Sequence, residues 1–342
     1  MTDRREELEA TARAMVADGE GILAADESNA TMTKRLEGVE VESTEDSRLA
    51  FRELLTATPD AGKAISGVIL YDETIKQKTS EGTPFPEFLT DRGMIPGIKV
   101  DTGAKDLAGA PGEKVTEGLD GLRERLAEYY ELGARFAKWR GVITIGDHLP
   151  SDYCVRVNAQ GLARYAALCQ EAGIAPIVEP EVLMDGEHTV DRSEQVTLNV
   201  LSTVFAELRA QRVLLEGMVL KPNMVLSGYD CSDQADVQEV AERTLETLRR
   251  TVPAAVAGIA FLSGGQSDER ATAHLNAMSA MGPHPWALTF SYGRALQAAP
   301  LKAWEGGENA DSARASFMLR ARCNSAAAQG QYSEEMEKEP VA

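Results

Sequence analysis

The feature that most limits the possible folds is a set of eight short apolar runs spread along the whole chain. They cover residues 21–26, 67–72, 97–101, 136–145, 175–181, 214–221, 258–265 and 286–293. Continuous apolar runs of this length are typical of strands that are buried on both faces of a parallel sheet. Pro222 ends the sixth run, because proline has no N–H to donate to a strand ladder.

Amphipathic helical patterns lie between many of these runs. The clearest cover residues 118–132, 159–172, 193–209 and 236–250. Residues 31–66 predict a further helical region, and residues 78–96 predict a loop interrupted by Gly and Pro. Strands that alternate with helices in this way predict an α/β fold, an eight-stranded parallel (β/α)8 TIM barrel. An open doubly wound sheet is the alternative.

Both ends of the chain carry sequence beyond the expected barrel. Residues 3–18 place Leu8, Ala12, Met15 and Val16 on one helical face, and residues 297–330 predict one or two C-terminal helices. We expect a single barrel domain over residues 1–332. Residues 333–342 are acidic and lack core residues, so they predict a flexible tail.

Composition narrows the functional class. The charged stretch from Met1 to Glu20 does not resemble a signal peptide, no run reaches the ~20 apolar residues of a membrane span, and the cysteines show no paired spacing. A cytoplasmic protein with reduced thiols is expected. A net charge of −19 argues against nucleic acid and anionic membranes as partners, but it does not exclude a small anionic substrate.

Charged residues gather at the carboxyl ends of the expected strands, where barrels of this type build their active sites. Because side chains alternate along a strand, both members of each pair point the same way: Lys99 with Asp101, Lys138 with Arg140, Glu179 with Glu181. Buried charges are costly unless they are paired or used, so these pairs predict a polar site inside the barrel. Ion pairs that only plug the barrel are the alternative.

Lys221 ends the sixth run and is the centre of the expected chemistry. Burial and a second cation such as Lys138 would favour its neutral amine, which is a nucleophile toward carbonyls. Glu179, Glu181 and Asp26 would then transfer protons. The alternative is a lysine whose stem lines the strand while its ammonium reaches solvent.

Two glycine-containing turns predict a phosphate site. Ser263 and Gly264 lie at the end of the seventh run, and Gly293 and Arg294 lie at the end of the eighth, where barrels often bind phosphate at helix N-termini. Cationic or hydroxyl side chains elsewhere would serve a second phosphate, and they include Ser28, Lys99, Arg140, Lys34 and Arg35. The four histidines lack metal-ligand spacing, so no metal or other cofactor is expected.

The motifs that carry these residues resemble those of class I fructose-bisphosphate aldolases from about residue 5 to residue 332. They are GILAADES, GVILYDET, GIKVDTG, FAKWR, PIVEPEVL, LKPNMV, FLSGGQS and WALTFSYGRALQA. The resemblance implies a metal-independent enzyme that cleaves fructose 1,6-bisphosphate to glyceraldehyde 3-phosphate and dihydroxyacetone phosphate, reversibly, in glycolysis and gluconeogenesis. It also implies a homotetramer.

The resemblance assigns roles to individual residues. Lys221 would form the Schiff base, Glu179 would be the main acid and base, and Lys138, Asp26 and Glu181 would position and tune them. Two groups of residues would hold the substrate ends: Ser263, Gly264, Gly293 and Arg294 near the ketone, and Ser28, Thr31, Lys99 and Arg140 at the far end.

Two positions depart from the family's animal members. Those enzymes end in a tyrosine that assists proton transfer, whereas this chain ends Glu339-Pro340-Val341-Ala342 and its last tyrosine is Tyr332; Thr144 stands where a lysine is usual. Two other functions stay open on the residues alone: another lysine-dependent aldolase or transaldolase for a different ketose phosphate, and a non-catalytic partner-binding role.

Overall fold

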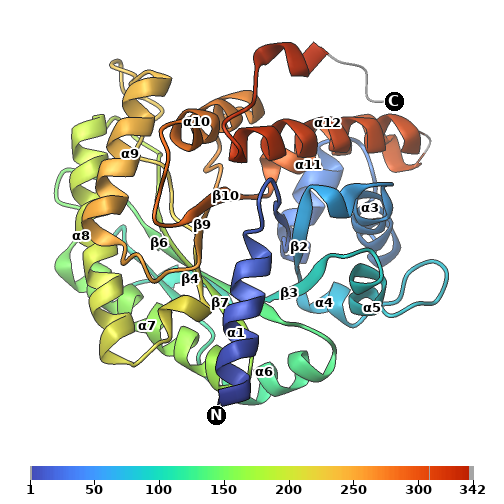
Figure 1. Cartoon of the computed structure of the whole chain (residues 1–342), viewed down its shortest axis with the longest axis horizontal. Coiled ribbons are helices and arrows are strands. Elements are labelled where there is room, and N and C mark those ends of the chain that lie inside the picture. The colour runs from blue at the N-terminus through green and yellow to red at the C-terminus, as the bar shows by residue number, and fades with distance from the viewer. Residues whose placement is uncertain (1, 308, 339–342) are drawn as a thin grey trace.

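Eight parallel strands close into a barrel in the computed structural model, which describes residues 2–307 and 309–338 (Figure 1). Each strand pairs with the next along the chain, and the last pairs with the first, which confirms the TIM barrel and excludes the open sheet. The strands are β1 (Gly21–Ala25), β2 (Ile65–Leu70), β3 (Ile95–Lys99), β6 (Phe136–Ile143), β7 (Ala175–Val182), β8 (Val219–Leu220), β9 (Gly258–Phe261) and β10 (Ala287–Tyr292).

Helices surround this barrel and extend it at both ends of the chain (Figure 1). They are α1 (Thr2–Met15), α2 (Asn29–Glu37), α3 (Glu45–Ala57), α4 (Asp72–Ile75), α5 (Phe85–Thr90), α6 (Leu122–Glu131), α7 (Asp152–Glu171), α8 (Val190–Ala210), α9 (Val237–Thr251), α10 (Asp268–Ala280), α11 (Arg294–Trp304) and α12 (Ala310–Ala328). Between residues 2 and 338, leaving residue 308 aside, no helix combines the length and apolarity needed to cross a membrane.

The amino end of the barrel is closed by α1. The apolar face expected for this helix is buried, and it packs in one cluster with inward-facing residues of the strands. The contact is close: a Cβ on Gly258, at the start of β9, would lie 2.7 Å from Val16. With this end filled, the opposite end, at the carboxyl ends of the strands, is left for the site.

The barrel interior changes from apolar to polar along the strands. The Phe136 ring fills the space beside two glycines, since a Cβ on Gly97 would lie 2.2 Å from that ring and one on Gly67 would lie 2.9 Å from it. Two residues further along β6 the same face carries Lys138. Strand alternation therefore places apolar packing in one layer and charged groups in the next.

Several local features differ from the sequence expectation. Leu215–Gly217 forms a 3-10 turn and only Val219–Leu220 is strand, because an apolar run does not separate a short helical turn from a strand. An antiparallel hairpin, β4 (Gly103–Asp106) and β5 (Lys114–Glu117), was not predicted, and α5 lies in the expected loop. The polar hairpin and the six-residue α5 are too small to produce a clear periodicity.

The C-terminal segment packs against the barrel domain over its described part. Glu334–Lys338 forms a 3-10 helix, η4, and Glu337 forms an ion pair with the buried Arg320 of α12. Tyr332 donates to the same carboxylate over 2.9 Å. Flexibility of the tail stays a prediction, and its residues 339–342 lie outside the described residues.

Candidate active site

A cavity of about 800 Å³ opens at the carboxyl ends of the barrel strands. It is lined by every residue to which the family resemblance assigned a role: Asp26, Ser28, Thr31, Lys99, Lys138, Arg140, Glu179, Glu181, Lys221, Ser263, Gly264, Gly293 and Arg294. These residues come from seven of the eight strands or the loops that follow them. Ion pairs that merely plug the barrel would leave no such space, so the plug alternative fails.

Lys221 is placed by the end of β8. Its backbone N–H donates to Val178 O of β7 over 2.8 Å, after which Pro222 stops the ladder. The residue is 4% exposed, and its Nζ lies 3.1 Å from Oε1 of Glu179. The ammonium therefore remains inside the cavity, and the alternative in which it reaches solvent is wrong.

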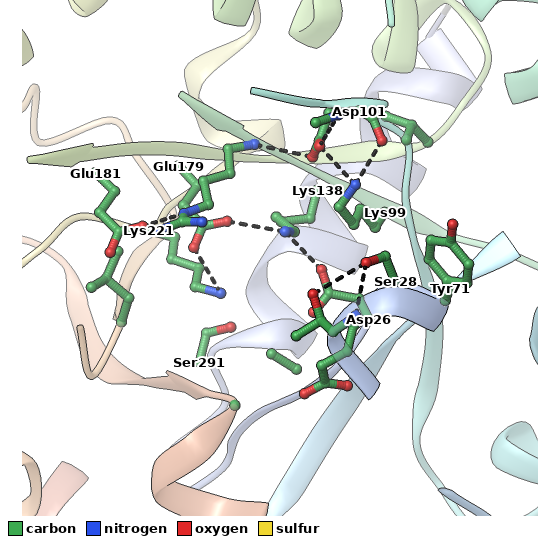
Figure 2. A pocket seen from close by; sticks show the side chains of 18 of the residues that line it. Asp26, Ser28, Tyr71, Lys99, Asp101, Lys138, Glu179, Glu181, Lys221 and Ser291 are labelled. Carbon is green, nitrogen blue, oxygen red and sulfur yellow. Dashed lines mark hydrogen bonds and ion pairs between the residues drawn. The ribbon is translucent and has the colours of Figure 1, made fainter. Parts of the chain in front are cut away.

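Glu179 lies between two lysines on the cavity floor (Figure 2). Its Oε2 is 3.4 Å from Lys138 Nζ, and that ammonium is 2.7 Å from Oδ2 of Asp26. The row Asp26, Lys138, Glu179, Lys221 thus alternates carboxylate and amine. A proton can pass between Lys221 and Glu179 directly, because a single short contact joins them.

The contacts within this row determine the protonation states of Asp26, Glu179 and Lys138. Burial alone would raise the pKa of Asp26, but Lys138 and Lys221 outweigh it and lower that pKa to about 2. The pKa of Glu179 is lowered in the same way by Lys221, Lys138 and Arg140 against the opposing effect of burial. Burial lowers the pKa of Lys138, yet Asp26 and Glu179 raise it well above its ordinary value. Both carboxylates are therefore bases at neutral pH, and Lys138 is a fixed cation.

Two further ion pairs line the same cavity. Arg140 Nε donates to Oε2 of Glu181, and Lys99 Nζ lies 2.7 Å from Oδ1 of Asp101. Figure 2 shows Lys99 and Asp101 on the side of Asp26 and Ser28, with Glu181 on the side of Lys221. Each pair thus brings a cation, Lys99 or Arg140, to the cavity wall, where an anionic substrate group could contact it.

The loops after β9 and β10 form one end of the cavity. Gly264 and Gly265 have φ of +60° and +91°, a backbone conformation that glycine adopts without strain. The Arg294 guanidinium lies directly over this turn, since a Cβ on Gly265 would be 2.7 Å from its Nη2. Arg294 also begins α11, so a forked cation, a glycine turn and a helix N-terminus meet here.

The other end is formed by the start of α2. Ser28 caps this helix, because its Oγ accepts from Thr31 N over 3.4 Å, and the two hydroxyls lie 3.1 Å apart. Both side chains line the cavity. Lys34 is exposed and outside it, whereas Arg35 lines it and donates to Glu27.

Comparison with known proteins agrees with this geometry. The family model described as "Fructose-bisphosphate aldolase class-I" matches residues 7–342. The chain belongs to the class I fructose-bisphosphate aldolase family. A Xanthomonas campestris protein named "Probable fructose-bisphosphate aldolase class 1" is 56% identical over 329 residues, covering 96% of this chain and 98% of that protein.

Two other family members extend the comparison. "Fructose-bisphosphate aldolase 4, cytosolic" of Arabidopsis thaliana is 51% identical over 331 residues, covering 96% of this chain and 84% of that protein. A solved structure of fructose-bisphosphate aldolase from Plasmodium falciparum superimposes with a TM-score of 0.96 at 50% identity and covers 97% of both chains. The resemblance seen in the motifs is thereby confirmed over nearly the whole chain.

Several cavity residues of this aldolase family member were missed by sequence reasoning. Ser291 lines the cavity, and its buried Oγ has no hydrogen-bond partner within the described residues. Ser291 lies on β10 two residues before Gly293, and this spacing was the available signal. Tyr71 and Glu27 also line the cavity. Each lies just after a strand, but neither belongs to a pair of charged residues two positions apart, which would have indicated inward-facing side chains.

Tyr229 contacts the cavity residue Gly264 without lining the cavity itself, and it also gave no sequence signal. It lies in the loop after β8, where its hydroxyl donates to the carbonyl of Gly264. Tyr332, the last tyrosine of the chain, is engaged with Glu337 and does not line the cavity. Among residues 2–307 and 309–338 no three His, Cys, Asp or Glu side chains form a group that could hold a metal ion.

Proposed function

We propose that the chain cleaves fructose 1,6-bisphosphate reversibly to glyceraldehyde 3-phosphate and dihydroxyacetone phosphate through a Schiff base at Lys221. The observation that carries this proposal is the buried amine of Lys221, 3.1 Å from Glu179 Oε1 on the floor of a cavity whose wall carries further cations. The family to which the chain belongs supplies the substrate.

Imine formation begins with a proton transfer from Lys221 to Glu179. The neutral amine adds to the ketone carbon of the substrate and gives a carbinolamine. Glu179 then returns its proton to the departing hydroxyl, so that water leaves and a protonated imine forms. Lys138 stays charged throughout, because Asp26 and Glu179 raise its pKa well above its ordinary value.

Carbon–carbon cleavage uses the protonated imine as the electron sink. A carboxylate, which we assign to Glu179, takes the proton of the hydroxyl on that carbon of the breaking bond which becomes the aldehyde. The electron pair of that bond moves into the imine and forms an enamine, while the aldehyde product leaves. Reprotonation of the enamine and addition of water release the ketone product. Because Tyr332 lies outside the cavity, we assign this reprotonation to Glu179 as well.

The two ends of the cavity would hold the two phosphates. Ser263, Gly264, Gly293 and Arg294 are proposed to bind the phosphate beside the ketone, and Ser28, Thr31, Lys99 and Arg140 the other. Asp26 and Glu181 are proposed to orient Lys138 and Arg140, with which they pair. The imine supplies the electron sink, so the proposed reaction uses no metal or cofactor.

We also propose a cytoplasmic location and a homotetramer. The first is supported by the relative named as cytosolic and the second by the family resemblance. A gel-filtration or mass-photometry measurement at micromolar concentration tests the assembly, and a monomer at that concentration would reject it.

The decisive test is trapping of the imine with borohydride. Incubation with fructose 1,6-bisphosphate and borohydride should add the mass of the reduced substrate fragment to the peptide that contains Lys221. Lys221→Met should abolish both trapping and turnover. Retained turnover in that variant, or loss of wild-type turnover in EDTA, would reject the mechanism.

A second assay separates the leading function from the other lysine-dependent aldolases. Fructose 1-phosphate lacks the phosphate that Lys99 and Ser28 are proposed to bind. Turnover should therefore favour fructose 1,6-bisphosphate in kcat/KM, and Lys99→Met should remove much of that preference. Equal kcat/KM values for both sugars would favour the alternative.

A further inference from the structure

The turn after β9 is held by a side chain that points away from the substrate space. Gln266 follows the two glycines of this turn, and both its backbone N–H and its side-chain Nε2 donate to the carbonyl of Ser263, over 3.1 Å and 2.9 Å. Its Nε2 also contacts Met224 Sδ at 3.6 Å. One carbonyl of the turn is therefore bound twice by one residue.

His274 fixes the orientation of that glutamine. It lies on α10 with no exposed surface, and its Nδ1 is 2.6 Å from Gln266 Oε1. Since Gln266 must present Nε2 to the Ser263 carbonyl, its Oε1 faces the histidine, and Nδ1 must carry the proton. Burial, with a smaller effect from Arg270, lowers the pKa of His274 to about 4, so the ring is neutral and holds this tautomer.

The other ring nitrogen of His274 does not take part in holding the turn. Nε2 of His274 is buried and, within the described residues, has no hydrogen-bond partner. A buried acceptor without a partner disfavours the folded state, and an apolar side chain would avoid this. Among the residues that the structure describes, the contact with Gln266 is thus the only hydrogen bond of this ring.

Holding the carbonyls of the turn directs its N–H groups. In a trans peptide the C=O and the following N–H point in opposite directions, so binding Ser263 O to Gln266 turns Gly264 N–H the other way. The Tyr229 hydroxyl binds the next carbonyl, that of Gly264, and likewise orients Gly265 N–H. No hydrogen bond among residues 2–307 and 309–338 uses either glycine N–H. Successive free N–H groups in such a turn form an anion-binding concavity.

We propose that His274 is a positioning residue for substrate binding: by fixing the amide of Gln266, it turns the Ser263–Gly264 peptide so that the turn binds the phosphate beside the ketone. The inference rests on the phosphate role proposed above for this turn. His274 acts through Gln266 and does not touch the substrate.

The test compares three variants of the full chain. His274→Phe keeps a planar ring of somewhat larger size and removes the Nδ1 donor, whereas His274→Asn can place an amide N–H close to the position of Nδ1. His284→Phe is the matched control, because His284 bonds Met278 O at the end of the same helix, over 2.8 Å, and lies away from the turn. Each is assayed for KM and kcat with fructose 1,6-bisphosphate and for competitive inhibition by inorganic phosphate.

His274→Phe should raise both KM and the phosphate inhibition constant by about tenfold, the effect of one lost hydrogen bond. The kcat should change by less than about threefold, since the groups at Lys221 are untouched. His274→Asn should recover most of the affinity, and His284→Phe should match the wild type. Unchanged phosphate inhibition in His274→Phe would overturn the proposal, as would an equal effect in the control.

Two further measurements keep the result interpretable. Borohydride trapping with dihydroxyacetone, which has no phosphate, should proceed equally in wild type and His274→Phe. If His274→Phe does not fold, Gln266→Leu takes its place with the same expected change, and unaltered phosphate inhibition there would also reject the proposal. A wild-type chain that traps no substrate at Lys221 would instead reject the proposed function, so the two failures are distinguishable.

Discussion

The protonation state of each charged side chain on the cavity floor depends on its neighbours. Asp26 is 9% exposed, and burial of an isolated carboxylate would favour its protonated form. The 2.7 Å contact with Lys138 reverses this preference. The same contact holds Lys138 as a cation beside Glu179, so removing Asp26 changes two residues that the proposed mechanism uses. Stability and catalysis are therefore coupled at this residue.

This coupling predicts a pH-dependent stability. The pKa of Asp26 is about 2 in the folded chain against an ordinary 3.8, so its contribution is present above pH 3.8 and is lost as pH falls toward 2. Urea unfolding of wild type and Asp26→Asn should differ by roughly 2 kcal/mol at pH 5 and by roughly half of that at pH 3. A difference that grows as the pH falls would contradict the assignment.

Glycines in the strands and helices differ in whether the fold needs the space that a side chain would fill. Substitution by alanine distinguishes the two kinds. Gly97 of β3 leaves room for the Phe136 ring, and a Cβ would meet that ring at 2.2 Å. Gly161 lies within α7, where a Cβ would meet nothing within 4 Å. Gly97→Ala should lower the free energy of unfolding by about 1–3 kcal/mol through overpacking, whereas Gly161→Ala should raise it by about 0.5–1 kcal/mol through helix propensity. Urea unfolding midpoints measure both, and equal shifts would refute this view of the barrel interior.

The tail helix η4 is predicted to depend on one buried cation. Arg320 is 3% exposed, and its guanidinium donates to Glu337 and, over 2.7 Å, to Thr272 Oγ1. Glu337→Ala would leave that cation without its carboxylate, so we expect a loss of up to about 3 kcal/mol and faster hydrogen exchange over residues 334–338. The exposed Glu335 offers the control, because Glu335→Ala should change stability by less than about 0.5 kcal/mol. Equal exchange in the two variants would show that the ion pair does not hold η4.

The elements that sequence predicted well are those with a strong period. Strands β6 and β7 were visible because buried parallel strands are continuously apolar, and the inward direction of Lys138 and Glu179 followed from strand alternation. The hairpin β4–β5 was invisible because its strands are short and polar. Contacts such as that between His274 and Gln266 depend on rotamers and on α10 packing against the turn, which no pattern in the chain encodes.

At the scale of the whole molecule, the net charge is negative although the cavity contains many cationic side chains. The chain carries −19, yet its cavity gathers Lys99, Lys138, Arg140, Lys221 and Arg294. Screening over a Debye length of ~8 Å lets these nearby cations outweigh distant surface carboxylates. An acidic composition is therefore compatible with the binding of a doubly phosphorylated sugar.

The packing of the whole barrel also decides which thiols react. All four cysteines are free, and Cys154, Cys169 and Cys323 are fully buried, whereas Cys231 is partly exposed in the loop that carries Tyr229. Burial raises the pKa of Cys154 and of Cys323 to about 11, which disfavours the reactive thiolate. A thiol-reactive disulfide reagent should therefore label one group rapidly in the native chain and all four in denaturant. Cys231→Ser should abolish the rapid phase, and a rapid phase that survives this change would show that the barrel opens far enough to expose its buried thiols.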